Sequence, residues 1–204
     1  MLKKFAIISL LGMSASAMAG GFQVKVGGSI IDPTGDYKLA GVGTVEADSE
    51  YAFTPSVEYF FNDYFSTELL LANPIVHDVH LEGQEAVKLR HLPPTLTVKY
   101  NFKNSSGFTP YIGVGATAFL PWHEDSRGDL AGTKVNVKED YGVAGQIGFN
   151  YLPDPKSNWG VFADVRYAEI SPEVDIKAAD GSRVANFDLD IDPFIYTVGF
   201  SYKF

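Results

Sequence analysis

Among the residues of this sequence, the histidines are the first candidates for metal ligands. His77 and His80 lie three positions apart in the stretch His77-Asp78-Val79-His80, and His91 follows later. A zinc site needs further ligands at a reliable spacing, and this stretch does not supply them. We therefore expect exposed loop histidines, with no metal and no cofactor bound.

The run His123-Glu124-Asp125-Ser126 contains the residue types of a hydrolytic triad. Adjacent positions on a loop do not place a base against a nucleophile, and triads are defined by geometry. We expect that the protein is not an enzyme. A lipid-modifying activity stays open as an alternative, and loss of phospholipid turnover in His123→Ala would support it.

A set of aspartates near the C-terminus supplies the oxygen ligands that Ca²⁺ prefers. A solvated acidic rim is the commoner role for such residues. The set comprises Asp175, Asp180, Asp188, Asp190 and Asp192.

The first 19 residues have the pattern of a secretory signal peptide. Lys3 and Lys4 precede a short apolar run, and Ala17-Met18-Ala19 is a small-x-small cleavage site. The apolar run is far below the roughly 20 residues that span a bilayer. We expect cleavage after Ala19 and one mature domain over residues 20–204.

The mature chain is acidic and has no cysteine. Without Lys3 and Lys4 it has 14 basic against 25 acidic residues, a formal net charge of −11. Such a charge argues against a nucleic-acid partner, which would need a basic face. A closed, hydrogen-bonded barrel can be stable without disulfides. Export, together with 11 Tyr and 15 Phe, indicates the outer membrane of a Gram-negative bacterium.

Period-two alternation of apolar and polar residues predicts eight strands. The links between them alternate long and short along the chain. An even number of antiparallel strands with this alternation is typical of outer-membrane barrels. We therefore predict an all-β fold, an eight-stranded antiparallel transmembrane barrel with short periplasmic turns and long extracellular loops. The alternating segments cover residues 21–31, 50–61, 64–72, 92–102, 108–120, 141–151, 159–170 and 194–204.

The polar phase of these strands carries charges that only a barrel lumen can hold. A soluble up-and-down barrel such as a lipocalin would turn its apolar phase inward instead. Because buried charges of one sign are costly, the mixed signs predict a salt-bridged polar plug in the lower lumen. We expect that plug to block water and ions, so that a hydrophobic passenger would leave sideways into the bilayer. The plug residues are Lys25, Glu58, Glu68, Lys99, Asp164, Arg166 and Lys203.

The polarity of the last two strands inverts just above Tyr167 and Phe194. The outward phase becomes acidic there, and the inward phase becomes apolar. An eight-stranded barrel has room for packed side chains or for one small ligand. The inward residues therefore either bind a small hydrophobic molecule at an extracellular mouth or pack it shut. They are Ile31, Leu70, Phe119, Ile170, Val174, Ile176, Phe187, Leu189, Ile191 and Ile195.

The phase of the sixth strand can also be continued backwards into the preceding link. It places Val135 and Val137 on the outside, which weakens the case for an apolar mouth on that side.

Several stretches resemble the outer-membrane protein W (OmpW) family of small barrels. They are Lys88–Phe102 with the block HLPPTLT, residues 109–115, 158–167 and 192–204, and the link 72–78. The resemblance implies an eight-stranded outer-membrane barrel that passes small hydrophobic molecules through a narrow, apolar-lined interior. The aromatic strand ending at Phe204 also looks like the signal read by the barrel-assembly machinery.

Two functions fit these observations. The first is a monomeric channel that passes small hydrophobic solutes, with outer-membrane lipid and, transiently, the assembly machinery as its other partners. The second is a closed structural or surface-interaction barrel whose long loops contact host, phage or envelope partners.

Overall fold

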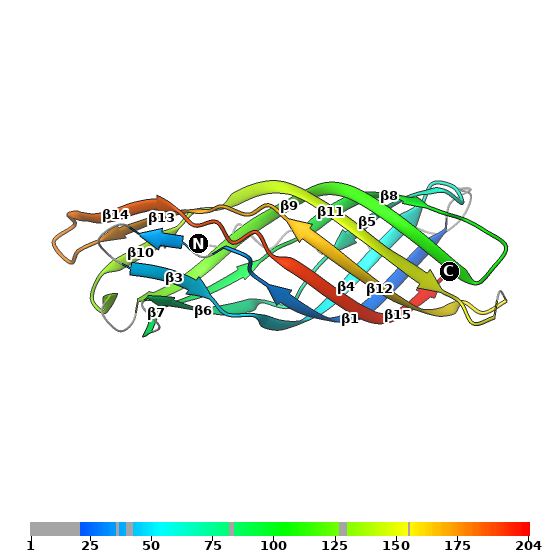
Figure 1. The fold of residues 1–204 in the computed structure, drawn as a ribbon, viewed down its shortest axis with the longest axis horizontal. Coiled ribbons are helices and arrows are strands. Elements are labelled where there is room, and N and C mark those ends of the chain that lie inside the picture. The colour runs from blue at the N-terminus through cyan, green and yellow to red at the C-terminus, as the bar shows by residue number, and fades with distance from the viewer. Residues whose placement is uncertain (1–20, 36, 40–42, 82–83, 127–129, 155) are drawn as a thin grey trace, which may run out of the picture.

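The computed structural model describes residues 21–35, 37–39, 43–81, 84–126, 130–154 and 156–204 (Figure 1). Within those ranges, no helix has the length and apolar character needed to cross a bilayer. The predicted signal peptide, residues 1–19, lies outside the described residues, so its cleavage stays a prediction.

Eight antiparallel strands close into a barrel, which confirms the predicted fold. Each strand pairs with its neighbour along the order β1-β4-β5-β8-β9-β11-β12-β15, and β15 pairs with β1 to complete the ring. Closure leaves every strand paired on both edges, as a membrane interior requires. The strands are β1 (Phe22–Asp32), β4 (Glu50–Phe60), β5 (Phe65–Leu70), β8 (Thr95–Asn101), β9 (Phe108–Ser126), β11 (Asp140–Tyr151), β12 (Trp159–Ala168) and β15 (Phe194–Lys203).

Short turns join the strands at one end of the barrel, where the C-terminus also lies (Figure 1). The turn between β4 and β5 is held by Asn62, whose side-chain oxygen accepts hydrogen bonds from the backbone N–H groups of Tyr64 and Phe65 at 2.8 and 2.9 Å. Asparagine favours such turns because its side chain bonds to the backbone just after it.

The long links are not plain loops, because they contain seven of the described strands. β7 pairs with the upper part of β9, and β6, β3 and β2 continue that sheet beyond the barrel. β10, β13 and β14 form a separate three-stranded sheet, here called the outer sheet. The strands are β2 (Tyr37–Leu39), β3 (Gly43–Ala47), β6 (Ile75–Leu81), β7 (Gln84–Leu92), β10 (Lys134–Val137), β13 (Glu173–Lys177) and β14 (Arg183–Asp188).

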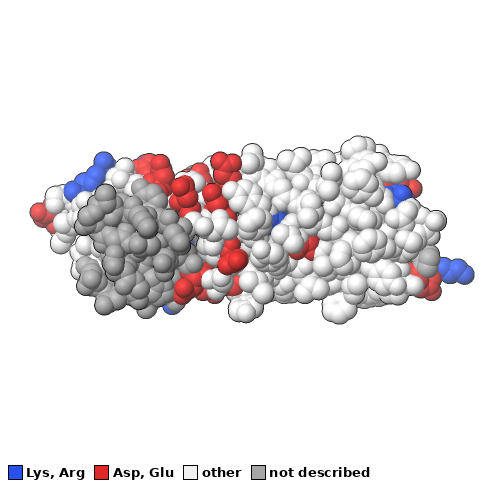
Figure 2. Space-filling view, viewed as in Figure 1, with Lys and Arg blue, Asp and Glu red and all other residues white. Residues whose placement is uncertain are grey.

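Apolar side chains face outward over the part of the barrel that lies toward the short-turn end. Val198 and Phe200 are 66% and 62% exposed, so the aromatic phase of the last strand points away from the lumen as predicted. Figure 2 shows a broad belt with very few charged atoms, and carboxylates gather in a band beyond it toward the outer sheet. An uncharged outer belt around a polar interior is the arrangement of a transmembrane barrel.

Candidate functional site

A fully buried cluster of charged side chains fills the lower lumen. Lys25 from β1 lies 2.7 Å from Glu58 and 3.1 Å from Glu68, and Lys99 from β8 lies 2.9 and 2.7 Å from the same two carboxylates. None of the four side chains is exposed. Four strands therefore contribute to one square of alternating charge.

Arg166 and Asp164, both from β12, complete this charged cluster. The guanidinium lies 2.8 Å from Glu68 and 3.2 Å from Asp164. Tyr111 donates a hydrogen bond of 3.0 Å to Asp164, and its ring lies 3.6 Å below the Lys99 ammonium. Three cations thus face three carboxylates, and the cluster is formally neutral. Neutrality and dense pairing offset the cost of removing these charges from water.

Lys203 does not join this cluster, which corrects the predicted plug. Its ammonium lies 4.6 Å from the centre of the Phe60 ring, and the side chain is only half-buried. In the register of β1 and β15, Lys25 lies opposite Ser201. Lys203 therefore lies two residues, about 7 Å, nearer the short-turn end.

A layer of hydroxyl groups lies above the charged cluster. Ser29 shares hydrogen bonds with Thr54 at 2.6 Å and with Thr197 at 2.8 Å, and Thr95 shares one with Thr117 at 2.9 Å. These side chains bond to one another across neighbouring strands. The interior therefore changes from charged to polar and then to apolar with height.

The structure places all the predicted mouth residues except Leu70 in the interior above this layer. Phe119, Ile170, Val174, Ile176, Leu189 and Ile191 are buried in one apolar cluster, with Phe187 packed against it. Ile31 and Ile195 belong to a second, smaller cluster. Leu70 is buried outside both, opposite Thr95 on β8.

A further strand, β7, contributes to the mouth, although its residues were predicted to be part of a link. Val87 and Leu89 of β7 are buried in the larger cluster, and the alternation Val87-Lys88-Leu89-Arg90-His91 was the signal that could have revealed them.

The expectation for Val135 and Val137 was wrong, because both pack into the mouth. They lie opposite Ile176 and Val174 in the outer sheet and share their face. The chain leaves strand geometry at residues 138 and 139, where two successive residues are exposed. That break resets the phase between β10 and β11.

His91 is buried, which contradicts the predicted exposed position. Its ring packs against that of Phe119 at a tilt of 32°, with 4.5 Å between ring centres. The cavity beside this pair, bounded below by Thr117, measures only about 20 Å³. Such a space holds about one water molecule. The described side chains around this cavity are therefore closely packed.

Carboxylates hold the connection where the outer sheet meets the barrel. The Ser171 backbone N–H donates to Asp140 at 2.7 Å, and the Ser171 hydroxyl donates to Asp190 at 2.7 Å. The Ile170 backbone N–H donates to Asp192 at 2.9 Å. Asp192 itself has φ of 38°, a left-handed conformation that aspartate tolerates better than most residues.

Two other aspartates of the set considered for Ca²⁺ make separate contacts. Asp175 lies 3.1 Å from Lys177 and 2.9 Å from Arg183, and Asp180 accepts hydrogen bonds from Ser182. Within the described residues, no three His, Cys, Asp or Glu side chains converge as a metal site.

The remaining candidates for chemistry lie on strands. His77 and His80 belong to β6, and His123 belongs to β9, but these side chains fall outside the part of the chain that the structure describes. Ser126 is described, and its hydroxyl donates a 2.8 Å hydrogen bond to the Thr133 carbonyl.

Comparison with known proteins places this architecture in a family. The model of the OmpW family matches residues 18–204. The chain belongs to the OmpW family. Outer membrane protein W of Vibrio cholerae serotype O1 is 30% identical over 197 residues, covering 91% of this chain and 89% of that protein. Outer membrane protein W of Escherichia coli K12 is 29% identical over 207 residues, covering 98% of this chain and 96% of that protein.

Solved structures agree with this assignment. The crystal structure of OprG from Pseudomonas aeruginosa superposes with a TM-score of 0.82 and 28% sequence identity, covering 92% of this chain and 97% of that one. The OmpW-family chain is thus a β-barrel of the Gram-negative outer membrane, in contact with membrane lipid.

Proposed function

We propose that this barrel takes up small hydrophobic molecules at its extracellular mouth and releases them sideways into the bilayer. The observation that carries the proposal is the reversal of polarity along the interior. Apolar side chains fill the lumen above the membrane, where the outer wall is acidic, and paired charges fill it below. An apolar interior in the extracellular part of a barrel favours apolar ligands over ions.

Uptake past these residues requires movement, because the packed side chains leave only about 20 Å³ beside His91 and Phe119. The outer sheet covers the mouth with Val137, Val174 and Ile176 and joins the barrel through the carboxylate-held connection. Displacement of this sheet would open the apolar cluster to the outside.

The charged cluster explains why release would be lateral. An apolar solute moving down the axis would have to separate buried ion pairs, and each unpaired buried charge is costly. The bilayer outside the wall is by contrast a favourable solvent for the solute.

Uptake of a hydrophobic fluorophore into liposomes containing the barrel tests the proposal. Leu189→Asp and Ile191→Asp should each lower the uptake rate by about tenfold or more, because an added 1.4 kcal/mol is enough for that factor and a buried carboxylate costs more. Val184→Asp is the matched control, since Val184 belongs to the same region but is 56% exposed. Resistance of the unheated barrel to unfolding in detergent shows that each variant is folded.

A closed structural or surface-interaction barrel is the second candidate, and the tightly packed mouth favours it. Unchanged uptake in both Leu189→Asp and Ile191→Asp would support this candidate and refute the first. We assign no catalytic role to the chain under either proposal.

A further inference from the structure

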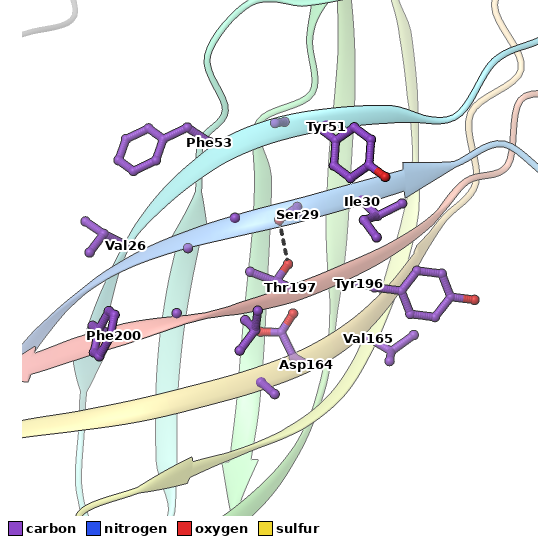
Figure 3. Close-up of a pocket in the computed structure, with 16 residues that line it drawn as sticks. Val26, Ser29, Ile30, Tyr51, Phe53, Asp164, Val165, Tyr196, Thr197 and Phe200 are labelled. Carbon is purple, nitrogen blue, oxygen red and sulfur yellow. Dashed lines mark hydrogen bonds between the residues drawn. The ribbon is translucent and has the colours of Figure 1, made fainter.

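A broad hollow lies in the outer wall of the barrel, away from the lumen. It measures about 920 Å³ and spans β4, β1, β15 and β12, around the seam where the first and last strands pair. Figure 3 shows its apolar rim. The side chains of Tyr51, Phe53, Ile30, Val26, Tyr196 and Phe200 form that rim.

The depth of the hollow comes from Gly28. Phe53 on β4 and Val198 on β15 lie directly opposite it, and Val26 and Ile30 flank it on the same face of β1. A methyl group added at Gly28 would meet nothing within 4 Å. The wall is therefore one side chain thinner here than at every flanking position.

The hollow is lined mainly by apolar groups. Tyr51 and Tyr196 bring phenol oxygens to its rim, and the Asp164 carboxylate in its lining is paired with Arg166 and Tyr111 inside the lumen. The hydroxyls of Ser29 and Thr197 bond to each other at 2.8 Å on the lumen side of the wall (Figure 3). A ligand in the hollow would meet side-chain carbons and aromatic rings, and would find no hydrogen-bond partner among these buried hydroxyls.

The height of the hollow indicates which lipid faces it. β1 rises from Phe22 at the short-turn end to Asp32 at the acidic band, and the hollow spans Val26 to Ile30. That interval is the outer half of the membrane-facing belt. The outer leaflet of a Gram-negative outer membrane consists of lipopolysaccharide, whose lipid A anchor carries saturated acyl chains.

We propose that the hollow binds one acyl chain of lipid A. It is continuous with the belt that already contacts membrane lipid, and a saturated chain can lie along the wall and fill the space over Gly28. Close packing of many weak contacts is what holds partners together inside a bilayer. A second barrel fits the hollow less well, because two convex walls meet along a narrow strip.

Lipid A retention by purified barrels tests this site. Barrels are incorporated into vesicles of phosphatidylethanolamine and lipid A, extracted in mild detergent, and analysed for bound lipid by mass spectrometry. The variants are Gly28→Phe, which fills the hollow, and Gly145→Phe as the control. Gly145 is a membrane-facing glycine of β11 that also has open space at its Cβ position but lies outside the hollow.

Wild type and Gly145→Phe should retain lipid A at the same level, and Gly28→Phe should retain about tenfold less. Gly28→Leu, a smaller filling, should give an intermediate loss and replaces Gly28→Phe if that variant does not fold. Equal retention in all folded variants would refute the site. Retention of phosphatidylethanolamine in preference to lipid A, or a dimer in detergent that Gly28→Phe abolishes, would show that the occupant is wrong.

Discussion

At the scale of single residues, the lumen is organised around Glu68. This carboxylate contacts Lys25, Lys99 and Arg166 at 3.1, 2.7 and 2.8 Å without any exposure to water. The sequence could predict the members of the cluster, because charges in the inward phase of a lipid-facing strand have nowhere else to lie. It could not predict the partners, since these depend on the stagger between strands that are far apart in the sequence. Lys203 shows the limit: its phase is inward, but its height separates it from the others.

The pairing of Lys99 with Glu58 predicts strong coupling between the two residues. Lys99→Met and Glu58→Gln should each lower the free energy of unfolding by about 3–5 kcal/mol, because each leaves an uncompensated buried charge. The double variant restores neutrality, so its loss should be clearly smaller than the sum of the two single losses. Urea unfolding in lipid vesicles measures all three.

Lys203→Met is the control for this cycle, since the side chain lies outside the charged cluster and is half-buried. It should change the free energy of unfolding by less than about 1 kcal/mol. Strictly additive losses in the Lys99 and Glu58 variants would show that the two residues do not act as a pair.

At the scale of elements, contact with lipid explains which strands could be predicted from the sequence. The eight barrel strands alternate sharply because one face meets hydrocarbon and the other a polar lumen. Beyond the membrane both faces of a strand can meet water, so β6 and β7 were taken for parts of links. The phase of β13 and β14 was read as an inverted continuation of the last two strands, but not as a separate sheet. β10 was misplaced because the break at residues 138 and 139 resets its phase. Such a break depends on how the outer sheet docks, which local sequence does not specify.

The outer sheet should loosen on strong acidification. Hydrogen bonding from Lys138, and then from Asn186, lowers the pKa of Glu173, and hydrogen bonding from Lys177, with attraction to Arg183, lowers the pKa of Asp175. A lowered pKa means that the ionised form is favoured in the folded sheet. The stabilisation is therefore complete above the ordinary carboxyl pKa of about 4 and is lost as the pH falls through the lowered values.

Amide hydrogen exchange in β13 and β14, corrected for the intrinsic effect of pH, measures this loosening. Protection should fall below about pH 4 in the wild type. Asp175→Asn should already show reduced protection at neutral pH and a shallower further decline. The barrel strands β1 and β15 serve as the internal reference. Protection in β13 and β14 that stays constant through this range would contradict the assigned role of the two carboxylates.

At the scale of the whole molecule, two exterior zones follow one another along the barrel axis, and the interior differs from the exterior at each height. A belt of apolar side chains meets the bilayer, a band of carboxylates lies beyond it, and the interior is charged where the exterior is apolar. Inside and outside thus exchange polarity at the membrane boundary. This exchange allows one chain to be anchored in lipid below and to offer an apolar interior above.

The arrangement predicts that ions do not flow along the axis of the wild-type barrel. The cluster spans the lumen with three cations, three carboxylates and the Tyr111 ring, so the wild-type barrel should show no steady conductance in planar bilayers. Replacing Glu58 and Lys99 together by alanine removes two large side chains while leaving the remaining charges balanced. That double variant should admit water and pass small ions in brief or steady openings, whereas Lys203→Ala should stay silent. Uptake of hydrophobic molecules should be unchanged in the double variant, because the lateral route does not pass the cluster. A wide, steady conductance in the wild type would mean that the cluster opens readily, and the case for lateral release would then fail.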